Sequence, residues 1–97
     1  MSKEDNQQSL SDALKSFIKK NRLQEGLDHV RAKEAWEKVM GPGISNYTRK
    51  VSLSGDTLHV YLDSSVLREE LSMGTTQILS MLNEELGSEL IRHIRLQ

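Results

Sequence analysis

The apolar residues of this chain change their spacing once, at Gly41-Pro42-Gly43, and that change constrains the fold more than any other feature. Before this break they recur every three or four positions, which is the period of an amphipathic helix. From Tyr47 to Leu62 they alternate with polar residues, which is the period of a strand with one buried face. Proline and glycine end a helix, because proline lacks a backbone N–H and glycine permits positive φ. The chain therefore combines helices with strands.

Two helices are expected before the break. The first would end near Asn21 and carries its apolar face at Leu10, Leu14, Phe17 and Ile18. The apolar face of the second lies at Leu27, Val30, Ala35, Trp36, Val39 and Met40. Ser9, followed by Asp12, is a candidate cap for the start of the first helix. We therefore expect residues 1–9 to be a flexible polar lead and residues 10–97 to be a single domain.

Two strands joined at Ser54-Gly55-Asp56 are expected to form an antiparallel hairpin. A helix of about twenty residues should follow, closed by Gly87. Gly74 inside it costs about 1 kcal/mol relative to alanine, so either another backbone approaches there or the helix bends. The tail at residues 90–96 is too short for a stable helix and is expected to be a third strand paired with the hairpin.

The predicted order is helix, helix, strand, strand, helix, strand. This is an α+β fold with the helices packed on one face of a small three-stranded sheet. Ninety-seven residues suffice for one modest core, and the chain has no cysteine, no apolar leader and no run of about 18 apolar residues. We therefore expect a cytoplasmic protein that makes no membrane contact.

The sequence contains few patterns that would indicate catalysis or metal binding. His29, His59 and His93 lie on three different predicted elements, without the close spacing of a metal site. Neither a Gly-x-Ser-x-Gly elbow nor a Gly-x-x-x-x-Gly-Lys phosphate loop is present. We expect a protein that is not an enzyme, with no catalytic residue, metal, cofactor or small-molecule substrate.

A formal net charge of −1 argues against an all-electrostatic nucleic-acid binder, so any such contact must come from local patches. Three groups of cations qualify, on the first helix, the first strand and the last strand: Lys15, Lys19 and Arg22; Arg49 and Lys50; Arg92, His93 and Arg95. If these groups shared one surface, they would form an electrostatic footprint for DNA. An ordinary mixed-charge surface is the alternative.

Two further residues are candidates for contact with a partner. Tyr61 is the exposed aromatic residue, since Trp36 is expected in the core. Arg68 points toward the apolar side of the long helix, where its guanidinium needs a partner. Snorkelling or an internal carboxylate pair would explain Arg68 structurally, and contact with a ligand or another protein would explain it functionally.

Five separated segments resemble the DciA-type family of bacterial proteins, formerly catalogued as a domain of unknown function. They are Trp36-x-x-Val39-Met40-Gly41, Gly55-x-Thr57-Leu58-x-Val60-x-Leu62, Ser64-Ser65-Val66-Leu67-Arg68-x-Glu70-Leu71, Leu82-Asn83-x-x-Leu86-Gly87 and Ile91-x-x-Ile94-Arg95. The resemblance covers residues 10–97. It implies a K-homology-like fold and a role with the replicative DNA helicase, as a loader or operator that also touches DNA.

The resemblance further implies a short stand-alone form, because longer members carry a flexible tail that this sequence lacks. The chain also lacks the Gly-x-x-Gly loop by which K-homology domains clamp a nucleic-acid backbone, so sequence-specific binding of single-stranded RNA is not expected.

Two hypotheses follow from these observations. The first is an accessory of bacterial DNA replication that binds the helicase and, weakly, DNA through Lys15, Lys19, Arg22, Arg49 and Lys50. The second is a protein-interaction or homodimerisation module without nucleic-acid binding, which would use a sheet edge or the Arg68 side of the long helix.

Overall fold

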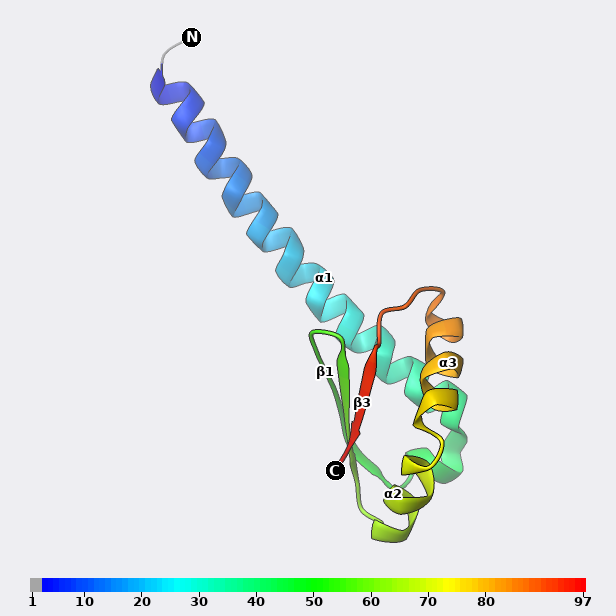
Figure 1. Ribbon diagram of the computed structural model, residues 1–97. Coiled ribbons are helices and arrows are strands. Elements are labelled where there is room, and N and C mark those ends of the chain that lie inside the picture. Colours follow the sequence, from blue (N-terminus) through cyan, green and yellow to red (C-terminus); the bar gives the residue numbers. More distant parts are fainter. Residues whose placement is uncertain (1–2) are drawn as a thin grey trace.

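The computed structural model describes the backbone of residues 3–97 and the side chains of residues 9–97. In chain order the elements are α1 (Lys3–Ser45), β1 (Thr48–Ser54), β2 (Thr57–Leu62), α2 (Ser65–Ser72), α3 (Thr75–Leu86) and β3 (His93–Leu96). The sheet lies beside α3 and the C-terminal half of α1, and the N-terminal half of α1 stands clear of the rest (Figure 1). The molecule consequently measures 65 × 23 × 19 Å. The predicted α+β class, with helices packed against a three-stranded sheet, is confirmed.

The two helices expected before Gly41 form one element, so the predicted end near Asn21 is wrong. The predicted start near Ser9 is also wrong, because the helix already includes Lys3. Of the lead that we expected to be flexible, residues 1 and 2 lie outside the described part of the chain, and residues 3–9 have helical backbone. Between the two predicted helices the sequence has one glycine and no proline, and therefore nothing that ends a helix.

The predicted break lies at Gly41, where φ is 78° and ψ is 174°. This region of backbone space is essentially restricted to glycine. Pro42 then begins one more helical turn, a position where its missing N–H costs no hydrogen bond. The backbone N–H of Asn46 donates to the Pro42 carbonyl at 3.0 Å and closes this turn.

The strands are ordered β1-β2-β3. The predicted hairpin is confirmed, since β1 and β2 are antiparallel with Val51 opposite Val60. The predicted third strand is confirmed as well, and it pairs with β2 in parallel, with Ile94 opposite Leu58. The pairing of β1 with β2 shifts between Thr48 and Lys50, which leaves Arg49 as an extra residue in the strand.

The core lies between one face of the sheet and helices α1 and α3. Its buried members are Ala32, Ala35, Trp36, Val51, Leu58, Val60, Leu62, Ile78, Leu82, Leu86 and Ile91. Trp36 is fully buried, as predicted, and its indole N–H donates to the Thr48 hydroxyl at 3.1 Å. Arg31 ties the two helices together, because its guanidinium donates to the Leu86 carbonyl at 2.8 Å, one of the carbonyls that the end of α3 leaves unpaired.

The long helix expected after the hairpin is divided into α2 and α3 at Gly74. Of the two explanations considered for Gly74, the bend is correct, because a Cβ placed there would meet only Gln77 Oε1, at 3.8 Å. The element order is therefore α-β-β-α-α-β. Gly87 closes α3 as predicted, with φ 74°.

Candidate nucleic-acid interface

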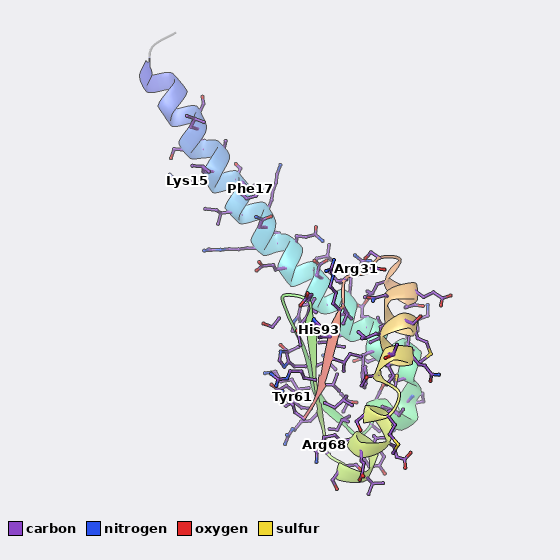
Figure 2. All side chains as sticks on the ribbon, viewed as in Figure 1. Lys15, Phe17, Arg31, Tyr61, Arg68 and His93 are labelled. Carbon is purple, nitrogen blue, oxygen red and sulfur yellow. The ribbon has the colours of Figure 1, made fainter. Side chains whose placement is uncertain are left out.

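The three cations predicted on the first helix lie on the part of α1 that stands clear of the sheet, and Figure 2 shows Lys15 in this position. Because α1 is continuous, Lys33 joins them. Lys33 follows Lys15 by 18 residues, which is five turns of an ideal helix, so the two side chains point the same way. Lys19 and Arg22 lie within about 40° of the line between them.

We call Lys15, Lys19, Arg22 and Lys33 the basic stripe. The rise of 1.5 Å per residue makes it about 27 Å long. The other residues along this line are Gly26 and His29, and neither carries a carboxylate. Lys33 was not predicted to share a face with Lys15, because the first helix was expected to end at Asn21; the absence of a helix-ending residue between them could have indicated it.

The basic stripe leads to a groove of about 390 Å³ between α1 and β1. Lys33, Arg49 and Lys50 line it, so the predicted pair on β1 lies beside Lys33. Lys15, Lys19 and Arg22 lie farther toward the N-terminus of α1 and line a separate hollow on the free part of the helix. Glu37 also lines this groove. Arg49 Nε lies 3.8 Å from Asp63 Oδ1, a loose pair in which both side chains are mostly exposed. Within residues 9–97, Lys33 and Lys50 form no ion pair and Arg49 is only loosely paired, so three cations face solvent at the groove.

The third cation group lies elsewhere. β2 separates β3 from β1, so His93 and Arg95 are not at the groove. Both are exposed, and Arg92 is held at the start of the strand by its N–H, which donates to the Asp56 carbonyl at 2.8 Å.

The two residues proposed for partner contact lie on different surfaces. Arg68 lines a hollow between α2 and β3, beside Ile94 and Leu96. Among the described residues it forms no ion pair within 4.0 Å, which favours snorkelling over an internal carboxylate pair. Tyr61 is half-buried, on the side of the sheet away from α2 and α3 (Figure 2). One compact patch cannot include both.

The free part of α1 also exposes large apolar side chains, among them Phe17 (Figure 2). We call this set the apolar stripe: Leu10, Leu14, Phe17 and Ile18, with 49–67% of each residue exposed. At 100° per residue these side chains point in the direction in which Ala32 and Trp36 enter the core farther along α1. The helix face that is buried against the sheet therefore continues, uncovered, along the arm.

Within residues 9–97, no three His, Asp or Glu side chains gather as metal ligands would. None of the helices in the described part of the chain is long and apolar enough to cross a membrane. Glu85 raises the pKa of Lys38 through a hydrogen bond and its negative charge, but this exposed pair lies on neither the stripe nor the groove.

One protein family, described as "Dna[CI] antecedent, DciA", has a sequence model that matches residues 9–96. The matched range contains all five of the segments on which the resemblance was based. No curated protein matches the chain.

Proposed function

Because the chain belongs to the DciA family, whose role is related to loading of the replicative helicase, we propose that it is a non-catalytic accessory of bacterial DNA replication. In this proposal it binds the replicative helicase and, weakly, DNA. The contacts with DNA come from Lys15, Lys19 and Arg22 on α1 and from Arg49 and Lys50 on β1.

The observation that carries the DNA-binding part is the continuity of the basic stripe with the groove. Its length of about 27 Å corresponds to the axial rise of about eight base pairs of B-DNA, at 3.4 Å each. Lys33 joins the stripe to Arg49 and Lys50, so a phosphate backbone along α1 can reach the groove without crossing a carboxylate before Glu37. The net charge of −1 keeps the overall attraction small, which is why weak binding is expected.

Fluorescence anisotropy with labelled single-stranded and duplex DNA at about 50 mM salt tests this part. The variant Lys15→Glu/Lys19→Glu should lose most of its affinity and show a shallower dependence on salt. Lys20→Glu is the matched control, because Lys20 lies on the same helix about 140° away from Lys15. Absence of binding by the wild type at tens of micromolar, or equal losses in the double variant and the control, would contradict the proposal.

The helicase-binding part rests on the family. A pull-down from a bacterial lysate, with the intact chain as bait, should recover the replicative helicase. Arg68→Ala and Tyr61→Ala then report which of the two separate surfaces contributes, since the structure keeps the residues apart. An eluate without helicase would contradict this part and leave the DNA measurement unaffected.

The apolar stripe favours a second candidate function, a homodimerisation module. Burying a side chain of this size contributes about 1.5–3 kcal/mol, so eight in a dimer, on average somewhat over half exposed, would contribute about 7–14 kcal/mol. Association costs about 4–15 kcal/mol, so a weak dimer is expected. An antiparallel pairing centred on Leu14 sets Leu10 of one copy against Ile18 of the other, the self-complementary contact that two-fold symmetry requires.

Sedimentation velocity over a range of concentrations tests the dimer. Phe17→Asp should leave only monomer. Leu23→Asp is the matched control, because Leu23 is 64% exposed but lies more than 100° away from Phe17 around α1. A wild type that remains monomeric at hundreds of micromolar would contradict this candidate.

A further inference from the structure

The sheet has one face that the helices leave uncovered. Val51, Leu58 and Val60 point into the core, so the residues that alternate with them point the other way. We call this second surface the open face; Lys50, Ser52, His59, Tyr61, His93 and Arg95 belong to it. Figure 2 shows Tyr61 and His93 on this side of the sheet.

Strand pairing gathers these residues from distant parts of the sequence. Lys50 of β1 is opposite Tyr61 of β2, and His59 of β2 has Ser52 on one side and Arg95 on the other. Residues opposite each other in neighbouring strands have Cβ atoms about 4.5–5.5 Å apart. The face is therefore one continuous surface and not a set of isolated charges.

The chemistry of the open face suits nucleic acid. It carries two cations, two imidazoles and one phenol ring, and none of its positions holds a carboxylate. Lys50 Nζ lies over the Tyr61 ring, 5.7 Å from its centre, so a cation contacts one face of the aromatic surface. His59 lies on the same side of β2, two residues before Tyr61. The rise of a strand places the two residues about 7 Å apart.

We propose that the open face binds single-stranded DNA, with a base stacked on Tyr61 and phosphates held by Lys50 and Arg95. Histidine rings are also surfaces on which bases stack, so His59 extends the platform by one position. This inference rests on the proposed DNA binding and specifies the form of DNA, because stacking on a sheet needs bases that are free of a duplex. The basic stripe of α1 differs, since it offers only charge and can serve phosphates of either form.

Lys50 belongs to both surfaces. Its side chain lines the groove at the end of the basic stripe and also lies beside Tyr61 on the open face. A single DNA strand whose bases lie on the open face can therefore continue past Lys50 toward Arg49 and Lys33. The two surfaces form a single path in which the open face selects unpaired bases and the stripe adds electrostatic attraction.

Anisotropy titrations with a labelled oligonucleotide of about 20 bases and with the corresponding duplex, each at several salt concentrations, test the inference. Tyr61→Leu removes the ring and keeps a large apolar side chain in the strand. It should weaken single-strand binding by about five- to 150-fold, the range that corresponds to stacking of one base, while the dependence on salt stays unchanged. Duplex binding should change little. Tyr61→Phe, the matched control, should retain single-strand affinity.

Arg95→Gln should instead reduce the magnitude of the salt slope on single strands by about 0.7, the value for one lost phosphate contact. Circular dichroism melts of each variant confirm that the domain is folded under the conditions of the titration. Equal single-strand affinities of Tyr61→Leu and Tyr61→Phe would overturn the inference. If Lys15→Glu/Lys19→Glu still lost affinity in that case, the proposed DNA binding would stand without it. If the wild type bound neither form of DNA, both would fail.

Discussion

The side chain of Asn83 joins α3 to the segment that leads into β3, and its removal should destabilise the domain strongly. Asn83 Nδ2 donates to the Ile91 carbonyl at 2.7 Å, and the Ile91 N–H donates to Asn83 Oδ1 at 3.0 Å. The amide thus pairs with Ile91 as a neighbouring strand would. Ile91 is 1% exposed, so water cannot easily replace these bonds. Asn83 belongs to the Leu82-Asn83-x-x-Leu86-Gly87 segment. This double contact explains physically why the segment has an asparagine at that position.

Asn83→Ala leaves both main-chain groups of Ile91 without a partner. Each unsatisfied buried group costs about 1–3 kcal/mol, and partial access of water in place of the missing side chain keeps the total near 2–4 kcal/mol. For a domain of this size, 1 kcal/mol corresponds to about 4–8 °C in melting temperature. A fall of at least about 8 °C is therefore expected.

Thermal melts followed by circular dichroism, together with urea titrations, measure this effect. The urea midpoint should fall with an unchanged slope, because the same surface is exposed on unfolding. Ser80→Ala is the matched control, since Ser80 is an exposed residue of the same helix, and it should shift the melting temperature by less than about 2 °C. A fall of less than about 4 °C in Asn83→Ala would show that the two bonds do not hold Ile91 in place.

Three other predictions concern the backbone and charge. Gly41→Ala should lower the free energy of unfolding by about 1–3 kcal/mol in a urea titration, because alanine is strained at φ 78° and ψ 174°. Gly74→Ala should be neutral or should raise it by up to about 1 kcal/mol, because φ is −128° and a Cβ there meets no close neighbour; a clear loss would contradict the bend. Because Glu85 raises the pKa of Lys38, the contribution of their 2.8 Å pair is present below the ordinary lysine pKa of 10.5 and is lost as pH rises through the higher folded value. The small difference in melting temperature between wild type and Glu85→Gln should thus be constant from pH 7 to 9 and should shrink above pH 10.5. A difference that already shrinks between pH 7 and 9 would contradict this assignment of the pair.

Local patterns determined which segments are helical and which are extended. Alternation identified β1 and β2, and the position of the third strand followed from the shortness of the tail. Trp36 was assigned to the core from its place on an apolar helix face, and it is fully buried. These predictions succeeded because the period of apolar residues directly reflects which face of an element is buried.

The same reasoning failed where a local signal was overridden or absent. The first helix was expected to end near Asn21, yet no residue between Asn21 and Leu27 ends a helix, and α1 continues through them. Gly74 alone could not distinguish a bend from a close backbone approach, because that depends on neighbours that are remote in sequence. Because two helices were predicted in place of the continuous α1, Lys33 was not aligned with Lys15, and the apolar stripe was expected to be packed against the domain.

The amino-acid sequence by itself therefore determined the kinds of element, most of their order, the burial of Trp36 and the family. Only the tertiary structure decided which surface residues share a face. Lys50, Tyr61 and Arg95 became neighbours through strand pairing, and Lys15 and Lys33 became aligned through an uninterrupted helix. The physical reason is that burial of apolar side chains leaves a period in the sequence, whereas a binding surface is assembled by contacts between distant segments and leaves none.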